Sequence, residues 1–333
     1  MLTCVSMTRA TARWKMANKL LATVDIGSHS CILLIAAFEE APVKSENPRS
    51  ETDSTKTSSW SVATGSMGIL VPKLQKVEIC RLGEDIYDSG RISPERIADL
   101  CRIMTKFRMD LHALGVELKA AAMTEAMRRA ENQEEVLDAV EKALWLRPRI
   151  ITGEEEAALT YRSVKEWHGE GIVTIDIGGG STEISNGATG FSIPVGALKM
   201  FKAMGPIPGP EYKKFVKETF KEVSFKGMTK KPVYLIGGTG TALAMVFKNL
   251  TQFDYKAIEG LEMSLSDLEA VTTRISNLSK ELRAMLPGLE NGRSDVIICG
   301  LFWLRSLLEK LRVETFRIST AGLRFGLLYP PNE

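Results

Sequence analysis

Two pairs of apolar segments, each interrupted by a short polar turn, stand out in the pattern of hydrophobic and polar positions. Residues 21–38 are mostly apolar apart from a turn at 27–30, and residues 172–184 have the same form. Apolar, β-branched runs joined by glycine-containing turns are typical of strands in hairpins rather than of helices. We therefore predict a β-hairpin at each place.

The rest of the chain alternates strand and helix patterns, which predicts an α/β fold with a largely helical C-terminal part. The best-marked helix begins at Pro94 after the capping residue Ser93 and stops at Gly115. Serine caps a helix, proline suits its first turn and glycine ends it. Further strands are expected at 76–82, 116–123, 147–152, 191–195 and 232–236, and further helices at 132–144, 154–167 and 294–311.

The hairpins share a sequence motif. D-I-G-x-x-S occurs at 25–30 and again at 176–181, and the two copies lie 151 positions apart. Repetition in the same strand, turn and strand context predicts two domains of one plan that present equivalent loops to a shared cleft. We expect domain I over 20–157 and domain II over 158–333.

Two segments break this pattern. Residues 1–19 contain several basic residues and no acidic one, which faintly resembles a transit peptide, although a disordered tail or an upstream start codon is the simpler interpretation. Residues 39–73 are rich in Ser, Thr, Lys, Glu and Pro with little periodicity. That composition predicts a flexible insertion in domain I.

Composition narrows the class of protein. The chain has 333 residues, of which 44% are hydrophobic, enough to give two domains a core each. A net charge of +2 gives the chain no overall positive electrostatic field that would attract a nucleic-acid backbone. The five cysteines are scattered without C-x-x-C spacing and are expected to be reduced thiols. No apolar run approaches the roughly 20 residues that cross a bilayer. We expect a cytoplasmic protein with no nucleic-acid or membrane partner.

The repeated turns are suited to binding phosphate. Glycine lets backbone N–H groups approach an oxyanion closely, and serine hydroxyls add donors. A third turn, at 237–241, follows an apolar strand and opens a helix, where free N–H groups and the helix dipole favour an anion. One such turn alone is as well explained by an ordinary hairpin. The candidate phosphate-binding residues are Gly27, Ser28, His29, Ser30, Gly178, Gly179, Gly180, Ser181, Gly238, Thr239 and Gly240.

Three acidic residues, Asp25, Asp176 and Glu183, lie on or beside these turns. Carboxylates next to bound phosphates repel them unless a cation intervenes, and Mg²⁺ binds both kinds of oxygen. A magnesium site is therefore expected at these three residues. The alternative for either aspartate taken alone is that it caps its turn.

Other charged residues are ambiguous from spacing alone. The run Gly153-Glu154-Glu155-Glu156 opens a helix, where acidic residues usually stabilise the helix dipole. Arg128 and Arg129 would ordinarily be surface residues. His112 and His168 likewise read as helix-surface residues, and only His29 falls within a suspected site.

The combination of motifs resembles the exopolyphosphatase and guanosine pentaphosphate phosphohydrolase (Ppx/GppA) family. The resemblance recurs in order across nearly the whole chain, and the DIGGGSTE segment with S-x-P-x-G-A downstream is its most specific part. The matching segments are VDIGSHS (24–30), CRLGE (80–84), MTEAMRRAEN (123–132), ITGEEEA (151–157), TIDIGGGSTEIS (174–185), SIPVGALKM (192–200), LIGGTGTALA (235–244), RSDVIICG (293–300) and STAGLRFGLL (319–328).

This resemblance implies two actin-like, ribonuclease H-like (ASKHA) domains around a cleft and a hydrolase of terminal phosphoanhydrides that uses magnesium. It implies that Glu156 activates the attacking water, that Arg128 contacts phosphate, and that Asp25, Asp176 and Glu183 suit magnesium. Polyphosphate is the favoured substrate and guanosine pentaphosphate the alternative. Members of the family often form homodimers, so the resemblance also allows a homodimer.

Three positions depart from the family pattern. His29 replaces an asparagine of the first turn, Ala158 replaces the arginine that often follows E-E-A, and Phe325 replaces the glutamate of G-L-R-E-G. Two other classes of function stay open at this point. A small-metabolite kinase would need an acceptor pocket and an adenosine site, and a non-catalytic phosphate or nucleotide sensor would have no use for Glu156.

Overall fold

The first of two mixed β-sheets is formed by the N-terminal half of the chain. The structure is a computed structural model that describes residues 19–39, 69–289 and 292–329. The strand order is β3-β2-β1-β4-β5, in which β1, β2 and β3 are antiparallel and β4 and β5 run parallel to β1. The strands are β1 (Leu20–Ile26), β2 (Ser30–Glu39), β3 (Ile69–Ile79), β4 (Glu117–Met123) and β5 (Arg149–Ile150).

The second sheet repeats this arrangement. Its order is β10-β11-β9-β6-β7-β8, with β6, β7 and β8 antiparallel and β9 and β11 parallel to β6. Strands β6, β7, β8, β9 and β11 thus take the places of β1 to β5. The strands are β6 (Val173–Ile177), β7 (Thr182–Ser185), β8 (Gly190–Ile193), β9 (Val233–Ile236), β10 (Glu262–Ser264) and β11 (Thr315–Ile318). The prediction of two units of one plan is confirmed at the level of the sheets.

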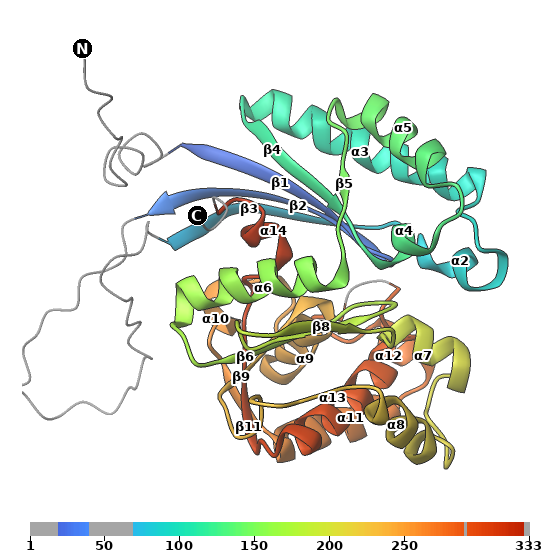
Figure 1. Ribbon diagram of the computed structural model, residues 1–333, viewed down its shortest axis with the longest axis vertical. Coiled ribbons are helices and arrows are strands. Elements are labelled where there is room, and N and C mark those ends of the chain that lie inside the picture. Colours follow the sequence, from blue (N-terminus) through green and yellow to red (C-terminus); the bar gives the residue numbers. More distant parts are fainter. Residues whose placement is uncertain (1–18, 40–68, 290–291, 330–333) are drawn as a thin grey trace, which may run out of the picture.

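Helices of the first half cover the outer face of the first sheet (Figure 1). The predicted start of α3 is confirmed, because the Ser93 hydroxyl accepts a hydrogen bond from Arg96 N at 3.4 Å. Its end is also confirmed, since Gly115 has a left-handed φ of 63°. The helices on this side are α2 (Gly83–Ser89), α3 (Pro94–Leu114), α4 (Glu125–Arg129) and α5 (Gln133–Leu144), and α6 (Gly153–His168) follows them in the chain.

The second half is built around the buried helix α13, which packs beneath its sheet. The Trp303 indole of this helix is fully buried and donates to Thr182 Oγ1 on β7 at 2.9 Å, which ties helix and sheet together. The helices of this half are α7 (Ala197–Met204), α8 (Tyr212–Lys221), α9 (Gly237–Lys248), α10 (Tyr255–Ile258), α11 (Leu265–Ser276), α12 (Lys280–Ala284), α13 (Ile297–Leu311) and α14 (Leu323–Gly326).

Helices α6 and α14 lie between the two sheets (Figure 1). Phe325 of α14 is fully buried there and meets the Trp167 ring of α6 edge-on, with centroids 5.8 Å apart. The same apolar cluster includes Leu34 and Phe38 of β2 and Tyr234 of β9. The two halves therefore share a common core instead of touching only at their surfaces.

Several element predictions need correction. Strand β3 begins at Ile69 rather than 76, so residues 69–73 of the predicted insertion belong to a sheet, and residues 1–18 and 40–68 lie outside the described part. Strand β5 has two residues where 147–152 was expected. The C-terminal part contains the short strands β10 and β11 as well as helices.

His168 is not the helix-surface residue that its position predicted. Its Nε2 lies 2.7 Å from Glu259 Oε1, and its ring stacks on Tyr234 with centroids 4.3 Å apart. Its side chain is only 8% exposed. His168 therefore fastens the end of α6 to the second half of the chain.

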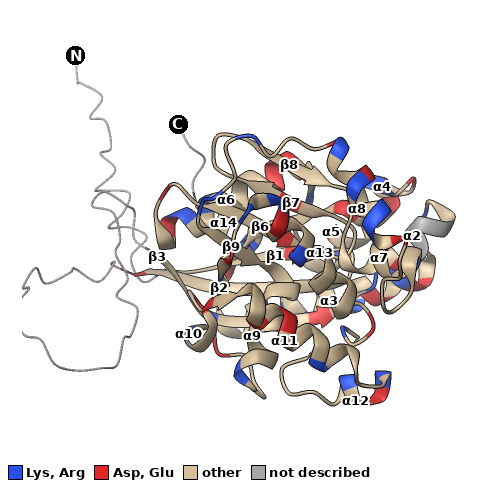
Figure 2. Ribbon diagram, turned by 90° about the horizontal axis from the view of Figure 1, so that it is seen from below, with Lys and Arg blue, Asp and Glu red and all other residues tan. Residues whose placement is uncertain are grey.

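Across the ranges given above, no helix has both the length and the apolar character that a bilayer-spanning segment requires. Lys and Arg positions are interspersed with Asp and Glu positions along the ribbon in Figure 2, in line with the small net charge.

Candidate active site

The predicted loops meet in one cleft between the two sheets. Its walls are formed by the turns at 27–30 and 178–181, the start of α9 and the first turn of α6. The predicted residues that line it are Asp25, Gly27, Ser28, His29, Ser30, Glu156, Asp176, Gly178, Gly179, Gly180, Ser181, Glu183, Gly238 and Thr239. The fold thus brings together positions that are far apart in the sequence.

The two D-I-G-x-x-S turns have the same local geometry. Gly27 N donates to Ser30 O at 3.0 Å, and Gly178 N donates to Ser181 O at 3.0 Å. A Cβ atom at Gly27 would lie 3.2 Å from that carbonyl oxygen, and one at Gly178 would lie 3.3 Å from its counterpart. A side chain would crowd either turn, which explains why glycine follows the D-I pair in both copies.

Each turn is also held by a neighbouring helix. The Ser28 hydroxyl donates to Glu125 Oε2 at 3.1 Å and accepts from Ala126 N at 3.1 Å, so α4 fixes the first turn. The carbonyl oxygens of Gly178 and Gly179 accept hydrogen bonds from the first amides of α7 at 2.9 to 3.0 Å. The loops are therefore rigid before any anion binds.

The third glycine-rich turn is shaped around Asp176. Gly237 has a φ of 78°, and a Cβ atom there would lie only 2.1 Å from Asp176 Oδ1. The Arg293 guanidinium covers Gly238, because a Cβ atom at Gly238 would lie only 2.1 to 2.2 Å from the atoms of that group. The predicted residue Gly240 is not part of the cleft wall, because it is buried within α9 and faces Leu235.

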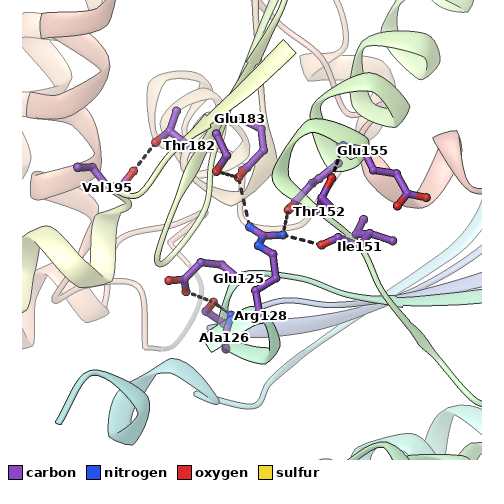
Figure 3. Close-up of polar contacts among 12 residues, drawn as sticks. Glu125, Ala126, Arg128, Ile151, Thr152, Glu155, Thr182, Glu183 and Val195 are labelled. Carbon is purple, nitrogen blue, oxygen red and sulfur yellow. Dashed lines mark hydrogen bonds and ion pairs between the residues drawn. The ribbon is translucent and has the colours of Figure 1, made fainter. Parts of the chain in front are cut away.

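Arg128 connects the acidic residues at one end of the cleft. Thr152 caps α6 by accepting from Glu155 N at 3.1 Å, which places Glu156 one turn into the helix, and Glu156 is only 8% exposed. Arg128 Nη1 donates to Glu156 Oε2 at 2.9 Å, and Nη2 lies 3.7 Å from Glu183 Oε1. Figure 3 shows Arg128 extending from α4 toward Glu183 and Ile151. Arg128 thus contacts carboxylates at the edge of the cleft and is not a surface residue.

Four carboxylates of the cleft, those of Asp25, Glu156, Asp176 and Glu183, have raised pKa values. Burial raises the pKa of Asp25 to about 7, with Arg324 opposing and Asp176 adding to the shift. Burial likewise raises the pKa of Asp176 to about 6 and that of Glu183 to about 7. The pKa of Glu156 is also raised, by burial and then by Glu183, while Arg128 opposes. The cleft concentrates negative charge that a cation would stabilise.

These residues fit a magnesium ion that completes its shell with substrate. In the described part of the chain, no group of three or more His, Cys, Asp or Glu side chains could hold a metal ion together. Mg²⁺ commonly takes one or two carboxylates together with waters and phosphate oxygens. Asp25, Asp176 and Glu183 offer hard oxygen donors on the wall of one cleft. The donor set therefore suits magnesium bound together with phosphate.

Three further charged residues line the cleft without having been predicted, namely Glu125, Arg293 and Arg324. Each falls inside a segment that carried the family resemblance, but nothing in its local sequence separates it from an ordinary surface charge. Their positions depend on packing between distant elements. Only the assembled fold identifies them as cleft residues.

Comparison with known proteins bears on this arrangement. The model of the Ppx/GppA phosphatase family matches residues 60–331. The chain belongs to the Ppx/GppA phosphatase family. As a family member it is similar to proteins named exopolyphosphatase 1 from Mycobacterium leprae, at 27% identity over 74% of this chain and 78% of the relative, and exopolyphosphatase 2 from Mycobacterium tuberculosis, at 27% over 89% and 92%.

Solved structures of Ppx/GppA proteins support the fold. The crystal structure of the Aquifex aeolicus family member matches with a TM-score of 0.70 and 26% identity, covering 93% of this chain and 96% of that one. An exopolyphosphatase structure from Cytophaga hutchinsonii matches with a TM-score of 0.75 at 18% identity, which supports the fold alone. The prediction of family membership and of a two-unit, actin-like α/β fold is confirmed.

Proposed function

We propose that the protein hydrolyses the terminal phosphoanhydride of inorganic polyphosphate. The observation that carries the proposal is the placement of Glu156, a buried carboxylate held by Arg128, in a cleft walled by three glycine-rich turns. Membership of a phosphatase family supports a hydrolase, and relatives named exopolyphosphatase support this substrate.

The residues of the cleft divide the work of phosphoryl transfer. Backbone N–H groups and hydroxyls of the turns at 27–30 and 178–181 bind the oxygens of the terminal phosphate, and the start of α9 adds further donors. One or two of Asp25, Asp176 and Glu183 would hold magnesium, which would neutralise charge on the phosphate oxygens. Phosphoryl transfer depends mainly on such positioning and electrostatic stabilisation.

Glu156 is the general base in this proposal. It takes a proton from a water molecule whose oxygen attacks the terminal phosphorus. The bridging P–O bond breaks, the shortened polyphosphate leaves, and the terminal phosphoryl group is released as orthophosphate. A raised pKa suits this role, because a base works best when its pKa is near the working pH. Arg128 fixes the orientation of the Glu156 carboxylate through its 2.9 Å hydrogen bond.

The test is phosphate release from long-chain polyphosphate and from guanosine pentaphosphate, measured in parallel with and without magnesium. We expect magnesium-dependent release from polyphosphate that disappears in Glu156→Gln. Release only from guanosine pentaphosphate would replace the substrate and keep the reaction. Binding of either compound without phosphate release in the wild-type protein would instead support a sensor.

A further inference from the structure

Arg324 occupies an unusual place in the fold, because it belongs to the second half by sequence and contacts the first half. It lies on α14, which follows β11 of the second sheet. Its backbone oxygen accepts a hydrogen bond from Thr23 Oγ1 of β1 at 2.8 Å. The residue is 6% exposed, and its side chain lines the cleft. A buried arginine requires hydrogen-bonded partners to be tolerated.

The Arg324 guanidinium has such partners in both halves. Its Nε and Nη2 donate to Gln75 Oε1 of β3 at 3.1 and 2.9 Å. The same Nη2 donates to the backbone oxygen of Thr320 at 2.8 Å. One planar group thereby connects an edge strand of the first sheet to the segment that leaves the second. The planar fork of arginine suits such a geometry and a lysine does not reproduce it.

The Thr320 side of this connection is itself fixed. Both the amide and the hydroxyl of Thr320 donate to Glu259 Oε2. Glu259 is 5% exposed, and its other oxygen accepts from Ser319 Oγ at 2.7 Å and lies 2.7 Å from His168 Nε2. The chain of contacts therefore runs from α6, whose first turn holds Glu156, to Arg324. Networks of this kind restrict geometry more than isolated pairs do.

Arg324 is also close to the aspartates of both D-I-G-x-x-S motifs. Its positive charge opposes the rise in the pKa of Asp25 and of Asp176 that burial causes. Asp25 belongs to the first half and Asp176 to the second. A fixed cation near both of them stabilises one separation of the two loops.

We propose that Arg324 is a positioning residue that sets the distance between the two phosphate-binding turns by joining Gln75 of the first half to Thr320 of the second. The expected effect on kcat rests on the proposed function. The expected change in the separation of the turns does not. Misplacing reacting groups by about 1 Å can slow catalysis by as much as about 100-fold. The turns keep their own internal hydrogen bonds, so substrate binding is affected less than turnover.

The kinetic test uses Gln75→Ala and Arg324→Lys, with Lys73→Ala as the control on the same strand. Lys73 is exposed, and its ammonium group pairs with Glu39 within the described residues. We expect kcat for phosphate release to fall about 10- to 100-fold in both variants, with KM changed less than about threefold. The double variant should lose little more than either single one, because both remove the same connection. If the wild-type protein is active and kcat is unchanged in both variants, the inference about Arg324 is overturned. The proposed hydrolase activity is not affected by that result.

An activity-independent measurement keeps the test decisive if wild-type protein releases no phosphate. Amide hydrogen exchange of the full chain should become faster in Gln75→Ala at both turns, 27–30 and 178–181, because their hydrogen bonds still form but open more often, while α13 stays protected. Faster exchange confined to residues near 75 and 320–326 would contradict the inference, since Arg324 would then act only locally. Gln75→Ala leaves Arg324 with its Thr320 contact, so it is the variant expected to fold most readily.

Discussion

The two halves of the molecule have the same strand order and differ in what they place beside the repeated aspartate. In the first half, Asp25 of β1 pairs with Ile32 of β2, whereas in the second Asp176 of β6 pairs with Glu183 of β7. The backbone register is the same, but only the second half places a carboxylate opposite the repeated aspartate. The two sheets thus offer equivalent positions that are chemically unequal.

The next parallel strand shows a second difference. After β4 the chain enters α4, which brings Arg128 to Glu156 and Glu125 to Ser28. After β9 it enters α9 through Gly237 and Gly238, which leave room for Asp176 and Arg293. The first half therefore contributes side chains that hold the proposed base, and the second contributes acidic groups and open backbone. This division suggests which substitutions should matter most.

The largest effect is expected at Glu156, in the helix that joins the halves. Glu156→Gln should lower kcat for phosphate release about 10²- to 10⁴-fold, because it removes a general base while keeping the side-chain shape. Glu155→Gln is the matched control, since Glu155 is the adjacent residue and pairs with Arg149 at the surface. Steady-state release assays on both variants check this. Equal rates for the two would remove Glu156 from the mechanism.

The next effect concerns stability at the contact between the halves. Phe325→Ala should lower the free energy of unfolding by about 3–5 kcal/mol, because it opens a cavity against Trp167. Phe247→Ala on α9 serves as a control, since Phe247 is 40% exposed and should cost far less. Chemical denaturation followed by tryptophan fluorescence measures both. If the free energy of unfolding falls as little in Phe325→Ala as in Phe247→Ala, α14 contributes little to the shared core.

Glu183 tests the chemical asymmetry directly. Glu183→Gln should raise the magnesium concentration needed for half-maximal activity by at least about tenfold, as expected on loss of a residue that supports a metal. Ile32→Val, at the equivalent register position of the first half, should change that requirement little and, because Ile32 is only partly buried, cost no more than about 1 kcal/mol of stability. A magnesium titration of both variants compares the halves. Equal shifts would show that the register difference has no bearing on the metal.

The smallest effect is a change in pH dependence. Ser192 Oγ donates to Glu183 Oε1 at 2.7 Å and so lowers the pKa of Glu183, against burial, which raises it to about 7. The proposed site needs ionised Glu183, so at limiting magnesium activity should be lost as pH falls through about 7. Ser192→Ala removes a hydrogen bond to the charged form and should move this acidic limb upward by about one pH unit. A downward movement in pH-rate profiles would contradict the assignment.

Local signals in the sequence were sufficient for much of the fold. Ser93, Pro94 and Gly115 bounded α3 correctly because capping depends on neighbouring residues alone. The D-I-G-x-x-S echo identified both turns, since the glycine requirement is local too. Strands β10 and β11 were missed because three or four residues are too short to show a period.

The site was predictable in part for the same reason. Asp25, Asp176 and the turn residues carry their signal in adjacent positions, and they do line the cleft. Gln75 and Arg324 are separated by 249 residues, and no local pattern indicates that they meet. His168 was misread because helical spacing cannot reveal that a buried Glu259 lies opposite. The roles of Asp25, Asp176 and the turn residues in binding metal and phosphate stay predictions until the variants are measured.

The packing of α14 has a consequence for synthesis on the ribosome. Thr23 and Arg324 are 301 residues apart, yet they are hydrogen-bonded, and Phe325 fills the core beside β2. Domains commonly fold from the N-terminus as they emerge, at about 5–20 residues per second. The part of the inner face of the first sheet that α14 covers can be buried only after nearly all of the chain has been translated. At that rate, this part of the apolar face stays exposed for roughly tens of seconds. A chain that ended before Leu323 would leave it exposed permanently.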